Sequence, residues 1–225
     1  MKKIIFPVFI LMVIMPSCVT SLRPLTTYNT AIIDDRIIGT WNSDEQEYTV
    51  QKFSESAIYK QLIKELPDTR KAKDQIRTKK EMQDSILYSK SYLIKYKKNK
   101  LEYFLFGNLI KLNGQLFMNF TSVDIQPLDS NDDISDAYID CINTHSIARV
   151  QFANSKNIRL DFIDGDFLYR QVKAGRIKIK NETDEMYDTF VITASTNDLQ
   201  QFILKYGNDD RFFNKENSVT LNRKS

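Results

Sequence analysis

The sequence predicts an all-β fold with a few minor helices, arranged as an antiparallel up-and-down β-barrel of about 8–10 strands. Three observations predict this class. Short segments in which apolar and polar residues alternate recur along the chain, and several of them are joined by hairpin-type turns such as Asn113-Gly114. Consecutive segments of this kind form a meander. The only tryptophan of the chain, Trp41, stands at the start of this β-rich body.

Composition is consistent with one globular domain. The chain has 225 residues and 12% aromatic residues, which is enough for a sizeable core, and only six glycines and five prolines. The formal net charge of +3 falls to +1 without Lys2 and Lys3, because residues 1–17 contain no acid. A nearly neutral chain has no overall attraction for nucleic acid, so we expect no nucleic-acid partner.

The first residues have the pattern of a secretory signal. Lys2-Lys3 precede the apolar run from Ile4 to Met15, which is too short to span a bilayer as a stable helix. Met15-Pro16-Ser17-Cys18 resembles a bacterial lipobox, which implies a signal peptide at residues 1–17 and a diacylglycerol on the sulfur of Cys18. The alternative is an ordinary signal peptide that is cleaved nearby.

The resemblance to bacterial lipoproteins also implies a location. An Asp directly after the lipidated cysteine retains such proteins at the inner membrane, whereas Val19 follows here. We therefore expect a lipid-anchored protein at the outer membrane of the cell envelope, facing the periplasm. With Cys18 lipidated, Cys141 has no partner for an intramolecular disulfide.

Residues 18–36 are predicted to be a tether, because they are polar, contain Pro24 and have neither helical nor strand periodicity. A flexible segment of this length reaches roughly 20–25 Å. The folded domain is then expected at residues 37–225.

The strands are predicted from alternation and turn residues. Residues 47–53 and 57–63 flank Ser54-Glu55-Ser56 and are expected to form a first hairpin. Asn113 and Gly114 both tolerate positive φ, which suits a type I′ turn. The other expected strands cover residues 92–97, 101–110, 115–121, 148–152, 158–162 and 218–223.

Helices are expected to interrupt the strands at residues 134–141, with Cys141 on the buried face, and after Asp166, which is expected to cap a short helix that ends at Gly175. The strongest helical pattern covers residues 196–206, with Ser195 as N-cap. Its apolar face must pack on the barrel wall or close an end. The polar segment Pro67–Ser89 is predicted to be a partly helical insertion, and a solvated loop is favoured over a lid or partner arm.

Three segments together resemble a group of lipocalin-like bacterial lipoproteins that have no established activity. They are Gly39-Thr40-Trp41, the hairpin of residues 109–117, and Thr193-Ala194-Ser195-Thr196 leading into residues 199–202. The resemblance implies a lipocalin-like barrel with the C-terminal helix packed on it. Lipocalins pack an arginine from near the C-terminus across the Gly-x-Trp indole, so it also implies barrel closure by Gly39, Trp41 and Arg223. The alternative is a frayed, solvated C-terminus.

Residues that carry chemistry are scarce. His145 is the only histidine, and the chain has no Cys-x-x-Cys, Gly-x-Ser-x-Gly or phosphate-binding glycine motif. We expect His145 to cap a turn or the preceding helix. The acidic residues Asp129, Asp132, Asp133 and Asp136 lack the spacing of a calcium loop and are expected to be solvated. The sequence therefore predicts no catalytic residue, metal or cofactor, and we do not expect an enzyme.

Two function classes remain besides the enzyme. One is a non-catalytic envelope lipoprotein whose barrel binds a small apolar ligand or another envelope component. The other is a protein-interaction module or inhibitor that has a filled barrel and acts through its loops and insertion. Large inward side chains fill a small barrel and small ones leave a cavity. The many aromatic residues favour the filled barrel.

Overall fold

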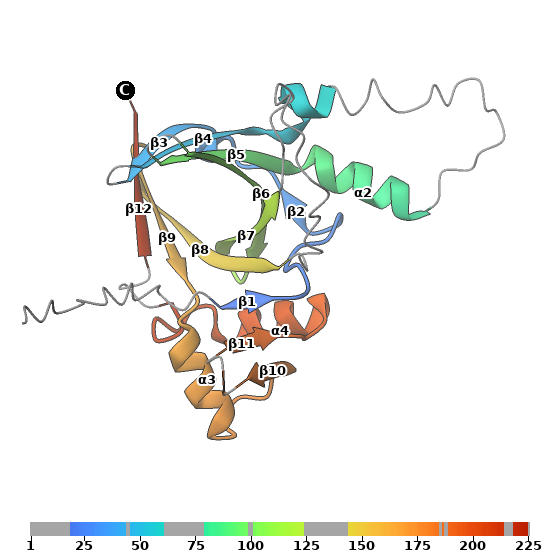
Figure 1. The fold of residues 1–225 in the computed structure, drawn as a ribbon, viewed down its shortest axis with the longest axis vertical. Coiled ribbons are helices and arrows are strands. Elements are labelled where there is room, and N and C mark those ends of the chain that lie inside the picture. Colours follow the sequence, from blue (N-terminus) through green and yellow to red (C-terminus); the bar gives the residue numbers. More distant parts are fainter. Residues whose placement is uncertain are drawn as a thin grey trace, which may run out of the picture.

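The computed structural model describes residues 19–43, 46–60, 79–98, 101–123, 144–184, 186, 189–213 and 218–224. Eight of its strands surround one interior (Figure 1). They are β3 (Gly39–Ser43), β4 (Gln46–Lys52), β5 (Ser91–Lys98), β6 (Leu101–Leu112), β7 (Gln115–Val123), β8 (His145–Asn154), β9 (Asn157–Phe162) and β12 (Ser218–Arg223).

The eight strands form a closed barrel. From β3 to β9 each strand pairs antiparallel with the next, and β12 then pairs with both β9 and β3. The predicted fold class is confirmed, since this is a lipocalin-like up-and-down barrel and helix α4 (Thr196–Tyr206) packs on its outer face.

Local sequence explains most of the wall. The turn between β6 and β7 has φ of 48° at Asn113 and 79° at Gly114, as the hairpin turn requires. Alternation places Ile94 and Tyr96 of β5 toward the interior, while Leu93 faces outward. The strands predicted after residue 90 are confirmed, and each end agrees within three residues.

A side module is inserted between β9 and β12. We use this name for α3 (Gly165–Lys173), β10 (Asn181–Asp184), β11 (Thr189–Ile192), α4 and the following residues to Phe213. It lies below β8 in Figure 1 and covers the outer face of β6–β8. Ser195 caps α4 as predicted, whereas the cap of α3 is Asp164 and not Asp166.

The layer between barrel and side module is apolar and rich in aromatic residues. Ile110, Phe117 and Ile147 of the barrel meet Phe202 and Phe213 of the module, and all five are at most 6% exposed. Gly207 permits the close approach, because a Cβ there would lie 2.8 Å from the ring of Phe117. The helix predicted at residues 196–206 therefore packs on the wall rather than closing an end.

A buried ionic cluster also joins the two parts. The guanidinium of Arg149 on β8 lies 3.1 Å from Asp161 of β9 and 2.8 Å from Asp210 of the side module. Arg159 and Ser218 bind the other carboxylate oxygen of Asp161, at 2.8 Å and 2.7 Å. The Asp161 side chain is only 1% exposed, so its charge depends on these partners.

The tether prediction for residues 18–36 is wrong for the described part of that range. β1 (Thr20–Ser21) pairs with β8 and β11, and β2 (Ala31–Ile32) pairs with β6. Leu25 is fully buried, and its backbone bonds to Asn119 of β7 and Gln200 of α4. We call residues 19–37 the N-terminal strap. It lacks periodicity because its contacts lie at separate points along the barrel and not along one continuous strand.

The first hairpin is also placed differently from the prediction. Residues 57–60 are helical, and the partners of β4 are β3 and β5. Phe53, in the 3₁₀ helix η2 (Phe53–Glu55), packs outside the wall against Phe106 and Tyr88. Because these contacts turn the chain away after β4, residue 57 starts a helix and not a strand.

The polar insertion is helical where the structure describes it. Helix α2 (Lys79–Ser89) lies between β4 and β5 in the chain, and Tyr88 anchors it to Phe53 and Phe106. The helix expected at residues 134–141, including Cys141, lies outside the described residues, as do the four aspartates at 129–136.

Candidate functional site

One end of the barrel is closed by a short helix and by Trp41. The 3₁₀ helix η1 (Asp35–Ile37) ends the strap, and the indole Nε1 of Trp41 donates a hydrogen bond of 2.8 Å to the Ile37 carbonyl. Trp41 is 1% exposed. The tryptophan therefore fixes the strap across the barrel end and forms part of the interior floor.

Arg223 covers the indole from the other side, as expected from the sequence. Its guanidinium carbon lies 4.2 Å from the Trp41 ring centroid. The same guanidinium donates to the carbonyls of Ile38 (3.0 Å) and Arg36 (2.7 Å). One side chain from the last strand thus binds both the tryptophan and the strap that crosses the barrel end.

Gly39 makes this arrangement possible. Its φ of +135° is a conformation that L side chains rarely adopt, and a Cβ there would lie 2.6 Å from Nη1 of Arg223. Gly39, Trp41 and Arg223 therefore act together at the closed end.

Tyr92 holds the strap from inside the barrel. Its hydroxyl accepts a hydrogen bond from the Asp34 amide (2.6 Å) and donates one to the Asp34 carbonyl (3.2 Å). Burial raises the pKa of Tyr92 to about 12, so the phenol stays protonated and keeps both bonds at physiological pH.

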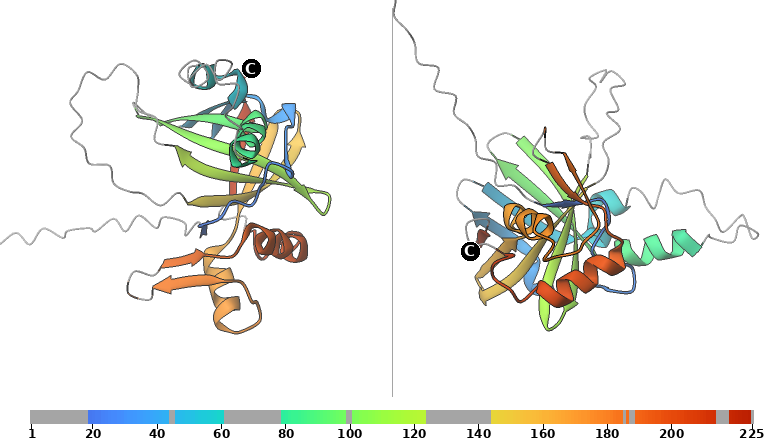
Figure 2. Two further views of the ribbon diagram at one scale, coloured as in Figure 1. Left: turned by 90° about the vertical axis from the view of Figure 1, so that its right-hand side faces the viewer. Right: turned by 90° about the horizontal axis from the view of Figure 1, so that it is seen from below.

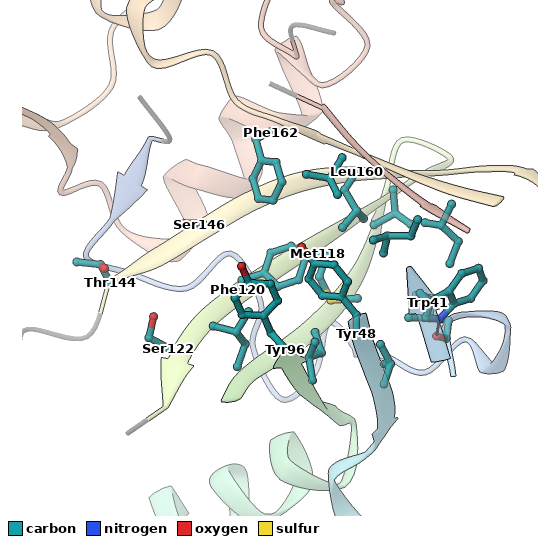
Figure 3. A pocket seen from close by; sticks show the side chains of 18 residues that line it. Trp41, Tyr48, Tyr96, Met118, Phe120, Ser122, Thr144, Ser146, Leu160 and Phe162 are labelled. Atoms are coloured by element: carbon teal, nitrogen blue, oxygen red, sulfur yellow. Dashed lines mark hydrogen bonds between the residues drawn. The ribbon is translucent and has the colours of Figure 1, made fainter. Parts of the chain in front are cut away.

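Above this floor the barrel contains a cavity of about 280 Å³. Figure 3 shows Trp41 at one end of it and Ser122 and Thr144 at the other. Side chains from all eight barrel strands and from η1 form its walls. They are Ile37, Trp41, Tyr48, Val50, Ile94, Tyr96, Leu105, Met118, Phe120, Ser122, Thr144, Ser146, Val150, Ile158, Leu160, Phe162, Val219 and Leu221.

The cavity is apolar, and its few polar groups are hydroxyls. The described lining contains no charged side chain. Ser122 and Thr144 are exposed at the ends of β7 and β8, which places the open mouth at the end away from Trp41. The lining can therefore hold an apolar molecule whose polar end lies at the mouth.

The expectation of a filled barrel is wrong. Many of the large aromatic residues lie outside the barrel interior, in the layer under the side module and in the cluster of Phe53, Tyr88 and Phe106. Valines occupy three inward positions of the wall, at residues 50, 150 and 219. These β-branched residues at inward positions are the sequence signal that could have indicated the cavity.

His145 begins β8, and its side chain lies on the outer face of the wall beside β7. The helix that it was expected to cap lies outside the described residues. Its Nδ1 lies 2.8 Å from the Thr121 hydroxyl and 3.3 Å from the Asn119 amide nitrogen. The Asn119 oxygen is occupied by the Leu25 amide, so its NH₂ group faces His145 and Nδ1 accepts. Burial lowers the pKa of His145 and favours this neutral form.

No family model, curated protein or solved structure matches this chain. The site is therefore interpreted from its own geometry. Cys18, the predicted lipidation site, lies outside the described residues. Within the described part of the chain, His, Cys, Asp and Glu side chains form no group of three that could hold a metal ion. None of the described helices is both long and apolar enough to cross a membrane.

Proposed function

We propose that this protein is a lipid-anchored, non-catalytic lipoprotein of the cell envelope whose barrel binds a small apolar ligand. The observation that carries the proposal is the apolar cavity between Trp41 and the open mouth. The atoms that line a void in a protein core lose van der Waals contacts that a packed interior would make. A ligand of matching shape restores these contacts, and apolar cavities of this kind are typical of ligand sites.

The size of the cavity limits the ligand. An engineered apolar cavity of about 150 Å³ holds benzene, and sites for drug-sized ligands occupy roughly 300–1,000 Å³. At about 280 Å³ the barrel suits a molecule of about two to three aromatic rings or a short alkyl chain. The hydroxyls of Ser122, Thr144 and Ser146 favour an uncharged polar end near the mouth.

The other parts of the proposal are supported by the sequence. Lys2-Lys3, the apolar run and Ser17-Cys18 support export and lipidation of Cys18. The closest approach to a catalytic arrangement in the described chain is His145 beside Thr121, and neither side chain lines the cavity. This placement supports a binding function rather than an enzymatic one.

The alternative function, an interaction module acting through its loops, assumed a filled barrel. The cavity removes that premise, and the described structure gives no separate observation in its favour. Ligand binding is therefore the better supported proposal.

Two measurements test ligand binding. The mature protein is purified in mild detergent, and native mass spectrometry looks for a bound small molecule. Titration with the fluorescent probe N-phenyl-1-naphthylamine then measures binding in the parent protein and in Val150→Phe, which fills the cavity. Val191→Phe, on β11 outside the cavity, is the matched control.

We expect the probe to bind the parent and the Val191→Phe variant equally, and the Val150→Phe variant at least about tenfold more weakly, which corresponds to 1.4 kcal/mol. Equal binding by all three proteins would show that the probe does not occupy the barrel. The anchor is tested by intact mass. Cys18→Ala should abolish a diacylglyceryl adduct that the parent carries.

A further inference from the structure

The N-terminal strap follows the outside of the barrel from the mouth to the closed end. At the mouth, β9 separates from β8 after the pair Phe162–Ala148, and β1 takes its place beside β8. At the closed end, β2 pairs with β6 and η1 crosses the floor. The described chain therefore enters the fold beside the mouth, between the barrel and the side module (Figure 2).

The residues at this entry point are buried and hydrogen-bonded. Val19 is 4% exposed, Ser21 is 1% exposed, and the Leu22 amide donates to the Ile192 carbonyl at 2.9 Å. Thr20 is paired with Ser146, whose side chain lines the cavity.

Covalent geometry then limits the distance between the anchor and the mouth. Paired antiparallel Cα atoms lie about 4.5–5.5 Å apart and consecutive Cα atoms 3.8 Å apart, so the Cα of Val19, the residue that follows Cys18 in the chain, is within about 9 Å of the Cα of Ser146. The headgroup layer on each side of a bilayer is about 5–7 Å thick. A lipid on Cys18 would thus hold the cavity rim close to the bilayer surface.

The rim has side chains that suit this environment. Tyr48, Tyr96 and Tyr103 come from three neighbouring strands at the mouth, with ring centroids 5.1 Å and 5.8 Å apart. Tyr103 is 50% exposed. Tyrosine is enriched at membrane–water interfaces, where its ring lies at the level of the headgroups.

We infer that the open mouth of the barrel rests on the surface of the bilayer that holds the anchor, with the tyrosine rim at headgroup level. An apolar ligand then moves between bilayer and cavity without crossing bulk water. The inference rests on the proposed lipidation of Cys18 and on the cavity as the ligand site, and it adds the orientation and the source of the ligand.

Fluorescence quenching from the membrane tests the orientation. The lipidated full-length mature protein, carrying Cys141→Ser, is labelled with bimane at one new cysteine and placed in phosphatidylcholine–phosphatidylglycerol vesicles that contain a spin-labelled lipid. The labels are Tyr103→Cys at the mouth, Lys156→Cys at the closed end and Lys178→Cys on the side module, all at exposed positions. Lys97→Cys, on the end of β5, is a second mouth label that leaves the rim intact.

We expect both mouth labels to be quenched several-fold more strongly than the labels at Lys156 and Lys178. Inserting ten Gly/Ser residues between Cys18 and Val19 should reduce this difference, because a flexible linker of that length adds roughly 16–19 Å of reach. Stronger quenching at Lys178 or Lys156, or equal quenching at all positions, would overturn the inference.

The same samples separate this inference from the proposed function. Intact mass shows whether Cys18 carries lipid, and the difference in N-phenyl-1-naphthylamine binding between the parent and Val150→Phe, measured without vesicles, shows whether the cavity binds. If lipid is absent or the cavity does not bind the probe, the proposed function fails and the inference fails with it. If lipid and binding are both present but the mouth labels are not preferentially quenched, only the orientation is wrong.

Discussion

The barrel interior and the layer beneath the side module are both apolar, but they are filled to different degrees. In the interior, side chains such as Val50, Val150 and Val219 surround a cavity of about 280 Å³. In the outer layer, aromatic side chains interlock, with ring centroids 5.8 Å apart for Phe117–Phe213 and 5.7 Å apart for Phe202–Phe212. The difference teaches that aromatic side chains pack tightly in the outer layer, whereas those of the interior, such as Phe120 and Phe162, line the cavity without filling it.

The largest expected effect concerns the ionic cluster in the outer layer. Asp161→Ala should lower the free energy of unfolding by about 3–5 kcal/mol, because Arg149 would lose its buried partner while its side chain stays 4% exposed. Urea unfolding measures the change. Asp210→Ala removes the other partner of Arg149, which is 80% exposed, and should cost less than about 1 kcal/mol. Similar losses in both variants would contradict the assignment of Asp161 as the buried partner.

The comparison is tested directly by adding volume to each region. Ala194→Leu should destabilise the protein by about 1–3 kcal/mol, because Ala194 is 1% exposed in the packed outer layer. Val150→Leu adds a methylene group next to the cavity and should leave the free energy of unfolding nearly unchanged. Thermal and urea unfolding measure the stability of both variants relative to the parent. An equal loss in both would show that the interior is as tightly packed as the outer layer.

Two substitutions test the closed end of the interior. Arg223→Met should cost about 0.5–2 kcal/mol through the lost cation–π contact with Trp41. Gly39→Ala should cost about 1–3 kcal/mol, from backbone strain and from its clash with Arg223. In the double variant the clash is absent. Its loss in free energy of unfolding should therefore be smaller than the sum of the losses in the two single variants. Strictly additive losses would mean that Gly39 and Arg223 do not act together.

The smallest expected effect is a pH dependence of the folding stability, which arises from His145. His145 has a lowered pKa in the folded protein, so the unfolded chain binds its proton at higher pH. The stability is therefore complete above the ordinary histidine pKa of about 6.5 and decreases as the pH falls below it. Urea midpoints between pH 8 and pH 5 should fall less in His145→Gln than in the parent. The same decline in both proteins would exclude His145 as its source.

The sequence predicted the parts of the fold that depend on neighbouring residues. The hairpin turn at Asn113-Gly114 and the cap of α4 at Ser195 are local signals, and both are confirmed. The contact of Arg223 with Trp41 was also expected, because it rests on strand alternation and on the lipocalin resemblance.

The parts that depend on distant residues were not predictable from local patterns. Leu25 is buried only because β7 and α4 bond to its backbone from far along the chain. Phe53 turns the chain away from a second strand because Phe106 and Tyr88 receive its ring. Whether an aromatic residue fills the interior or the outer layer depends on the position of the side module, and composition does not contain that information.

The position of β12 has a consequence for how the molecule is made. β12 is the last described strand, it closes the barrel between β9 and β3, and Arg223 is 185 residues away from Ile38 along the chain. Contacts of such high sequence separation form slowly, and the barrel cannot close before its final residues are available. On the proposed export from the N-terminus, the barrel would therefore stay open until translocation is complete, and the cavity would form only in the compartment that receives the chain.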